Sequence, residues 1–452
     1  MTGGARKREP CRARAVVGQN APMPADPRAT TDDLLAFIAA SPSPYHAVAT
    51  AADRLTLAGF TEVRLDAEWP VAKAPSFVRR GGTLIAWRPG RPGAGFRIVG
   101  AHTDSPNLRI KPQPDRRSVG YRQFGVEVYG GVLLNSWLDR DLGLSGRVAV
   151  ADPGGDGTEE CLFRIDEPIL RIPQLAIHLD REVNERGLVL NRQAHLAPIW
   201  GVGRDDGRGL RELVASAIDV EPSHVLAWDA MCHDLTPPTL AGVDRELISA
   251  PRLDNQLSCH AAVEAIITAT AGVADATSTA VVVLFDHEEV GSTTDRGAAG
   301  ALLATVLERI SVTQGVDRAG HLRALGASHC VSADGAHATH PNYPERHEPD
   351  HLVALNGGPV VKVNSSARYA TDAASVGPFL AACASVEVPV QWFVTRSDLA
   401  CGSTIGPLTA AQLGVPTVDV GVAQLAMHSA REMAGADDPP RFVAALGAYL
   451  SR

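Results

Sequence analysis

Five short segments of this chain are rich in histidine and carboxylate residues, and they are spread over most of its 452 residues. Some of them directly follow a short apolar run of the kind that forms a buried strand. Because parallel strands end at one edge of a sheet, residues at their carboxyl ends can meet in one crevice although they are far apart in the sequence. The segments are 101–105, 251–255, 286–291, 332–335 and 427–429.

Together the five segments contain the residue types that a pair of zinc ions needs. They offer two imidazoles, three carboxylate ligands and one further carboxylate, which is the ligand inventory of a two-metal hydrolase. His102 and Asp104 lie two residues apart at a strand end, so the carboxylate can orient the imidazole. Glu288 and Glu289 are adjacent, which fits one metal ligand and one general base.

Each segment alone has a simpler explanation. An isolated His-x-Asp is more often a structural pair, and two adjacent glutamates are usually solvated charges. The order of the segments along the chain, their positions at strand ends and their complementary ligand types favour a metal centre instead.

The spacing of the segments also predicts the domain organisation. About 150 residues separate Asp104 from Asp254, which is too long for a loop inside a compact domain. We therefore predict an inserted, mostly β domain at residues 106–245, within a discontinuous catalytic domain at residues 31–105 and 246–452. The β-type segments of the insertion include 126–129, 146–150, 162–165 and 175–179.

Outside the insertion, apolar runs of strand length alternate with helix-like runs. This alternation predicts an α/β sandwich with a largely parallel central sheet. The helix-like runs are 32–38, a helix that starts at Pro44 and ends at Gly59, 257–271 and 298–310. The strand-like runs are 83–87, 96–100, 279–285, 359–363, 391–395 and 417–420.

Composition limits the class of protein. The chain is 45% apolar, has a mean hydropathy near zero and lacks an apolar run of about 18 residues, so we expect a globular protein without a membrane span. Its start lacks the apolar part of a secretory signal, which favours the cytoplasm. The net charge of −9 argues against a nucleic-acid partner. Seven cysteines without a Cys-x-x-Cys pair favour free thiols.

Residues 1–30 differ from the rest of the chain. They contain clustered arginines and several prolines without apolar periodicity, and they predict a disordered tail before a fold that begins near Thr31. A targeting peptide is disfavoured by Glu9 and by the missing amphipathic repeat. A start of translation at Met23 is a further alternative.

The five segments and their surroundings resemble those of the M18 family of metallo-aminopeptidases, which includes the aspartyl aminopeptidases. The likeness covers nearly everything from Thr31 to the C-terminus. Where many relatives have Asn and Ile, this chain has His287 and Val290, and neither change removes a ligand or the base. The segments that carry the resemblance are 41–48, 100–106, 286–292, 336–343 and 419–429.

The resemblance implies roles for the residues of the five segments. It implies two Zn²⁺ per subunit, of which one is held by His102 and Asp334. The other is held by Glu289 and His428, and Asp254 bridges both ions.

Further roles follow from the same resemblance. Glu288 is the implied general base, and Asp104 supports His102 from behind. His337, Lys362 and Tyr369 are the implied contacts of the substrate.

The resemblance also implies assembly. His178, in the insertion, is similar to a family histidine that reaches into the active site of a neighbouring subunit. Residues 106–245 are then a dimerisation or oligomerisation domain, and the protein is a homo-oligomer built from dimers, possibly a dodecamer.

These implications predict a co-catalytic di-zinc aminopeptidase that releases a single N-terminal residue, preferably Asp or Glu, from peptides. The acidic preference rests on the likeness and on Lys362, whose ammonium group can pair with an acidic side chain. Related di-zinc aminopeptidases of neutral specificity and N-acyl amino acid deacylases are alternatives with a similar ligand set. A catalytically silent, self-assembling structural particle is an alternative of another class. The same ligands also accept manganese or cobalt.

Overall fold

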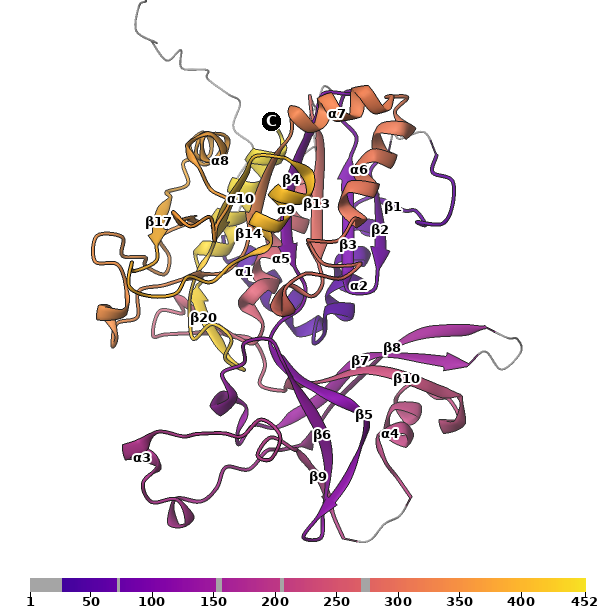
Figure 1. The fold of residues 1–452 in the computed structure, drawn as a ribbon, viewed down its shortest axis with the longest axis vertical. Coiled ribbons are helices and arrows are strands. Elements are labelled where there is room, and N and C mark those ends of the chain that lie inside the picture. Colours follow the sequence, from indigo (N-terminus) through magenta and orange to yellow (C-terminus); the bar gives the residue numbers. More distant parts are fainter. Residues whose placement is uncertain (1–26, 71–73, 152–156, 204–206, 270–276) are drawn as a thin grey trace, which may run out of the picture.

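The computed structural model describes residues 27–70, 74–151, 157–203, 207–269 and 277–452. Within these residues the strands form sheets of nine, six and five strands. Figure 1 shows the six-stranded sheet in the lower part of the view, below the helix-covered nine-stranded sheet. Met23 and most of the predicted tail lie outside the described residues, as do the last two residues of the helix-like run 257–271.

The nine-stranded sheet has the order β1-β2-β3-β13-β4-β14-β18-β16-β17. Five of its eight neighbouring pairs are parallel, which confirms the predicted largely parallel α/β sheet. Its strands are β1 (Thr61–Glu62), β2 (Ser76–Arg80), β3 (Thr83–Arg88), β4 (Phe96–His102), β13 (Thr279–Phe285), β14 (His329–Ala333), β16 (Val360–Val363), β17 (Gln391–Val394) and β18 (Thr417–Gly421).

Helices cover both faces of this sheet. Successive residues of the buried strand β13 point to opposite faces, so that Val282 packs in one core and Val283 in the other. The first core is closed by α1 (Pro27–Ala40), α2 (Pro44–Leu57), α5 (Leu253–Thr268), α8 (Ala373–Ser385) and α10 (Asp438–Leu450). The second core is closed by α6 (Leu302–Thr313), α7 (Arg318–Gly326) and α9 (Ile405–Leu413).

Helix α1 begins four residues earlier than the sequence suggested. The prediction of a tail up to residue 30 is therefore wrong for residues 27–30. Tertiary hydrogen bonds fix this first turn, since Arg28 Nη1 donates to the carbonyl oxygen of Arg245 at 2.6 Å. Thr31 Oγ1 donates to the carbonyl oxygen of Ala436 at 2.7 Å. Neither partner is visible from the local sequence.

The six-stranded sheet is antiparallel throughout and has its own hydrophobic core. Its order is β8-β7-β10-β5-β6-β9, and all six strands lie within the predicted insertion. Helices α3 (Val183–Arg186) and α4 (Leu210–Ala217) lie between its strands in the sequence. The strands are β5 (Asn107–Ser118), β6 (Tyr121–Tyr129), β7 (Leu142–Ala151), β8 (Thr158–Leu170), β9 (Ile199–Val202) and β10 (Val225–Asp234).

One β-type segment of the insertion was predicted wrongly. Residues 175–179 form no strand but contain the 3-10 helix η2 (Ile177–Leu179). The turn is closed locally, because the backbone N–H of Leu179 donates to the carbonyl oxygen of Ala176 at 2.8 Å. Leu175 and Leu179 remain exposed, so the alternation of apolar residues here does not reflect burial in a sheet.

The five-stranded sheet connects loops that are distant in the sequence. It consists of β11 (Thr239–Ala241), β12 (Leu247–Ala250), β20 (Glu432–Gly435), β19 (Ala423–Leu425) and β15 (Ala336–His337), in that order. Strand β11 lies before residue 245 but pairs outside the six-stranded sheet. The domain bounds at 105 and 245 stay predictions. None of the helices in the described ranges has the length and apolarity to cross a bilayer.

Candidate metal centre

Three neighbouring strands bring most of the predicted site residues to one edge of the large sheet. Strands β13, β4 and β14 are adjacent and parallel, so their carboxyl ends lie together. The other two site residues come from the start of α5 and from the turn between β19 and β20. The residues at these ends are His102 on β4, Glu288 and Glu289 on the 3-10 helix η4 (Glu288–Val290) after β13, Asp334 after β14, Asp254 on α5 and His428 before β20.

These side chains form three overlapping groups in which the possible ligand atoms lie within 4.8 Å of one another: His102 with Glu288 and Glu289, and two groups that contain Asp254. The two groups with Asp254 are the following. In the first, His102 Nε2 is 3.2 Å from Asp254 Oδ1 and 3.3 Å from Asp334 Oδ1. In the second, His428 Nε2 is 3.5 Å from both Asp254 Oδ2 and Glu289 Oε1. The two oxygens of Asp254 therefore face different imidazoles.

Both imidazoles present the same nitrogen to the carboxylates. Nδ1 of His102 donates to the backbone carbonyl oxygen of Asp104 at 3.0 Å. Nδ1 of His428 donates to the carbonyl oxygen of Gly131, also at 3.0 Å. These bonds fix the ring orientations and leave Nε2 of each ring for the shared centre, as in the outer support of metal-binding histidines.

The crowding of acids and imidazoles shifts their pKa values strongly. Burial raises the pKa of Glu288 to about 8, and the neighbouring carboxylates of Asp334 and Asp104 add to this shift. Burial and the charge of Asp254 raise the pKa of Glu289 well above its ordinary value. Burial alone would lower the pKa of His428, but a hydrogen bond with Asp254 and the charge of Glu289 raise it to about 10. Such strong shifts are typical of functional sites.

The residues present fit a divalent cation. Asp254 Oδ1 and Glu289 Oε1 are buried oxygen atoms that accept no hydrogen bond, although such atoms normally have a partner. The donors are imidazole nitrogen and carboxylate oxygen, which zinc binds in proteins. A cation between these groups would also offset the repulsion of carboxylates that lie close together.

Asp104 supports the centre from behind and is fully buried. Its carboxylate accepts hydrogen bonds at 3.1 Å from the backbone N–H groups of Glu288 and Glu289. It also accepts a bond of 2.7 Å from the hydroxyl group of Tyr129, which comes from the six-stranded sheet. The contact of Tyr129 was not predicted, because nothing near it in the sequence indicates its partner.

Glu432 is a second supporting residue that the sequence reasoning missed. It is 2% exposed, and its carboxylate accepts the backbone N–H of His428 at 2.7 Å and that of Asp254 at 2.9 Å. Burial and the charge of Asp254 raise its pKa to about 8. One side chain thus joins the backbones of two site residues. The only local signal is a carboxylate four residues after His428.

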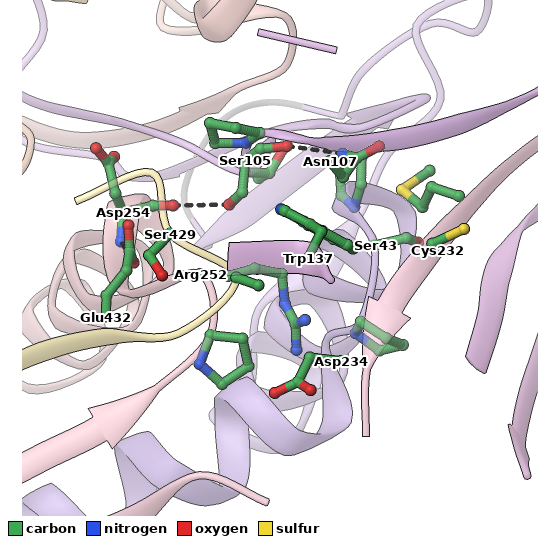
Figure 2. Close-up of a pocket in the computed structure, with 17 residues that line it drawn as sticks. Ser43, Ser105, Asn107, Trp137, Cys232, Asp234, Arg252, Asp254, Ser429 and Glu432 are labelled. Carbon is green, nitrogen blue, oxygen red and sulfur yellow. Dashed lines mark hydrogen bonds between the residues drawn. The ribbon is translucent and has the colours of Figure 1, made fainter. Parts of the chain in front are cut away.

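A small cavity of about 20 Å³ lies next to Asp254, at the junction of the large sheet with the six-stranded sheet. Figure 2 shows Ser105 donating to the carbonyl oxygen of Asp254 on one side of this cavity, with Glu432 beside it. On another side the guanidinium group of Arg252 points toward Asp234. Ser105 and Glu432 thus bind the carbonyl oxygen and the N–H group of Asp254, respectively.

The predicted substrate contacts lie in different environments. Lys362 is 2% exposed and not solvated: its ammonium group donates to the carbonyl oxygen of Gly335 at 3.0 Å and lies 3.6 Å from Asp334 Oδ2. The ring of Tyr369 lies 5.2 Å from this ammonium group. His337 is exposed on β15. His178 is exposed on η2, and no hydrogen bond or ion pair found among the described residues joins it to the centre.

Comparisons with known proteins agree with this architecture. Residues 37–450 match the family model described as aminopeptidase I zinc metalloprotease (M18). A probable M18 family aminopeptidase 2 of Mycobacterium leprae is 52% identical over 427 residues, which cover 94% of this chain and 99% of the relative.

Solved structures show the same fold. The cryo-EM structure of the Ape4 and Nbr1 complex matches with a TM-score of 0.90 at 36% identity, covering 94% of this chain and 86% of that one. The Saccharomyces cerevisiae mApe1 dodecamer matches with a TM-score of 0.81 at 28% identity, covering 93% and 96%. With its parallel sheet, its buried cluster of imidazoles and carboxylates and these similarities, the chain belongs to the M18 family of zinc aminopeptidases.

Proposed function

We propose that this zinc aminopeptidase holds two zinc ions per chain and prefers peptides that begin with Asp or Glu. The observation that carries the count of two is the position of Asp254, whose two oxygens face two different imidazoles. His102 and Asp334 would hold one ion, Glu289 and His428 the other, and Asp254 would bridge them. Zinc bound there supplies positive charge that polarises a peptide carbonyl, acidifies water and favours the ionised form of nearby carboxyl groups.

The protein's own proton carrier in this proposal is Glu288. Its carboxylate is close to His102, but it does not belong to either group that contains Asp254. It takes a proton from the attacking water and delivers it to the amine nitrogen of the leaving peptide. Burial raises the pKa of Glu288, and zinc bound beside it would favour the carboxylate form that a general base needs.

The proposed acidic preference rests on a positive charge beside the predicted metal ligands. Lys362 places a buried ammonium group beside Asp334, and the ring of Tyr369 lies against it. A positive group in a dry site attracts a carboxylate more strongly than an exposed one does. A substrate whose first side chain carries a carboxylate would benefit from this charge, whereas an apolar side chain would not.

A panel of substrates tests the preference. The zinc-loaded protein is assayed with peptides that differ only in an N-terminal Asp, Glu, Ala or Leu, together with an N-acetylated Asp peptide. We expect the highest kcat/KM for Asp and Glu and no cleavage of the acetylated peptide. Faster cleavage of the Ala or Leu peptide would refute the preference, and turnover of the acetylated peptide would favour a deacylase.

We further propose that the active protein is a homo-oligomer in which His178 reaches the site of a neighbouring subunit. Two observations support assembly: the mApe1 relative is a dodecamer, and the segment around His178 exposes Leu175, Ile177 and Leu179. Apolar side chains grouped on a surface are typical of subunit interfaces.

A further inference from the structure

A short segment of the six-stranded sheet enters the metal centre of its own chain. Residues 129–133, which we call the brace, begin at the last residue of β6 and continue toward the 3-10 helix η1 (Leu134–Trp137). The brace is separated by more than 100 residues from every predicted metal ligand except His102. Its contacts with the centre are therefore tertiary contacts between two different sheets.

On one side the brace supports the strand ends of the large sheet. The hydroxyl group of Tyr129 donates to Asp104 Oδ2 at 2.7 Å, and the same oxygen accepts the backbone N–H of Glu289 at 3.1 Å. The guanidinium group of Arg109 lies 4.0 Å from the centre of the Tyr129 ring and fixes its position. Tyr129 thus acts on the backbone of Glu289 through the carboxylate of Asp104, whose other oxygen lies 3.5 Å from Nδ1 of His102.

On the other side the brace holds the histidine that comes from the β19–β20 turn. The carbonyl oxygen of Gly131 accepts the bond from His428 Nδ1 at 3.0 Å. The backbone N–H of Leu133 donates to the carbonyl oxygen of His428 at 3.1 Å. The ring and the backbone of His428 are therefore both bonded to the brace, which matters because His428 has a left-handed backbone with φ of 66°.

The two glycines of the brace are explained by its closeness to the site. A Cβ atom at Gly130 would lie 3.0 Å from Cβ and 3.2 Å from Oε2 of Glu289, and its φ of 75° also favours glycine. A Cβ atom at Gly131 would lie 3.1 Å from Nδ1 of His428. A Cβ atom at either position would therefore require a predicted zinc ligand to shift by a few tenths of an ångström.

We propose that the brace positions both halves of the metal centre, so that the inserted sheet of each chain is needed for zinc binding in that same chain. Tyr129 and Gly131 are the positioning residues, one for each half. This inference rests on the proposed metal ligands. It concerns contacts within one chain, whereas the role proposed for His178 is a contact between two chains. Loss of such outer contacts typically weakens metal binding or activity by about 10- to 100-fold.

Two substitutions, each with a matched control on β6, test the proposal in the full-length, zinc-loaded protein. Tyr129→Phe removes only the hydroxyl group, and Tyr121→Phe makes the same change at a side chain that is 45% exposed. Gly131→Ala adds a methyl group beside His428. Gly125→Ala adds one whose nearest neighbour, Lys111 Cδ, is at an ordinary 3.5 Å.

The readouts are the rate of zinc release to a coloured chelator and the separate values of kcat and KM. We expect Tyr129→Phe and Gly131→Ala to release zinc about 10-fold faster or more, and to lower kcat with little change in KM. Both control variants should behave like the wild type. Because zinc release needs no substrate, the result does not depend on the proposed acidic preference.

The outcomes separate the two proposals. If the wild-type protein retains two zinc ions and all four variants release them at the wild-type rate, the brace has no positioning role and the inference is refuted. If the wild-type protein binds no zinc at these residues, the proposed ligand set itself fails. If the controls lose zinc as readily as Tyr129→Phe and Gly131→Ala, the effect belongs to β6 in general, which also refutes the specific role of the brace.

Discussion

Replacing Glu432 by glutamine tests how the backbones of two zinc ligands are held together. The carboxylate accepts one backbone N–H from His428 and one from Asp254. Glutamine has nearly the same shape, but only its carbonyl oxygen can accept. Its amide nitrogen would face a backbone N–H group, so one of the two hydrogen bonds must be lost.

The size of the effect follows from the kind of bond that is lost. A hydrogen bond typically contributes about 0.5–1.5 kcal/mol, and leaving its buried N–H partner unsatisfied costs about 1–3 kcal/mol, because that group cannot reach water. If the lost bond lets Asp254 or His428 leave its position in the metal-free chain, regaining that position costs the same free energy when zinc binds. A value of about 2 kcal/mol corresponds to an increase of about 30-fold in the zinc dissociation constant.

The assay is equilibrium dialysis against a series of buffered zinc concentrations, followed by measurement of metal per chain. Glu127→Gln is the matched control, because Glu127 is exposed on β6. Hydrogen exchange provides a second readout, in which peptides that contain the amides of residues 254 and 428 should exchange faster in Glu432→Gln.

The reasoning would be refuted if Glu432→Gln bound two zinc ions with wild-type affinity while those peptides kept wild-type exchange rates. Faster exchange with unchanged zinc affinity would mean that the metal-free loops keep their positions by other contacts. The role of Glu432 would then be in the stability of the fold and not in metal binding.

Three further variants test other residues. Glu288→Gln should keep its zinc and lose about 10²- to 10⁴-fold in kcat, the usual contribution of a general base, and retained turnover would exclude Glu288 from that role. His178→Ala should lose activity with its zinc intact. Co-expression with Glu288→Gln should restore part of that activity, because in a mixed oligomer an intact His178 can reach a site with an intact Glu288. Full activity of His178→Ala alone would rule out a role of His178 in the neighbouring site. Burial, with the charges of Arg164 and Arg252, lowers the pKa of His46 to about 4, so the fold favours its neutral form: the stability from this group is complete above about pH 6.5 and is lost as the pH falls toward 4. Thermal scans between pH 7 and 4 should therefore show a smaller drop in Tm for His46→Gln than for the wild type, and identical slopes would contradict this assignment.

The parts of the site that the sequence reasoning found are those with a local signal. His102 lies at the end of the apolar strand predicted from residues 96–100, and Glu288 and Glu289 follow the one predicted from residues 279–285, so strand pattern and residue type together indicated their positions. The parallel sheet was predictable for the same reason, because apolar runs and helix-like runs alternate along the chain.

The supporting residues could not be predicted from the sequence, because their partners depend on how strands and sheets pair in the folded chain. Glu432 is placed opposite Ala250 by the pairing of β20 with β12, which brings it to the backbone of Asp254. Tyr129 contacts Asp104 only because the end of β6 lies against the carboxyl end of β4 in the folded chain. Conversely, the apolar alternation between Leu175 and Leu179 was wrongly predicted to be a strand. Such a pattern does not show whether a neighbouring strand is present to pair with it, and here both leucines are exposed.

The wide separation of the site residues in the sequence links zinc binding to the folding of the chain. His102 and Asp334 are 232 positions apart, and the centre also needs α5, the β19–β20 turn and the brace to be in place. The unfolded chain cannot present this set of ligands, so binding is linked to the folding of nearly the whole chain. Free zinc at 100 times its dissociation constant would stabilise the native state by about 2.7 kcal/mol for one ion. A chain that holds zinc at this centre has therefore completed its folding.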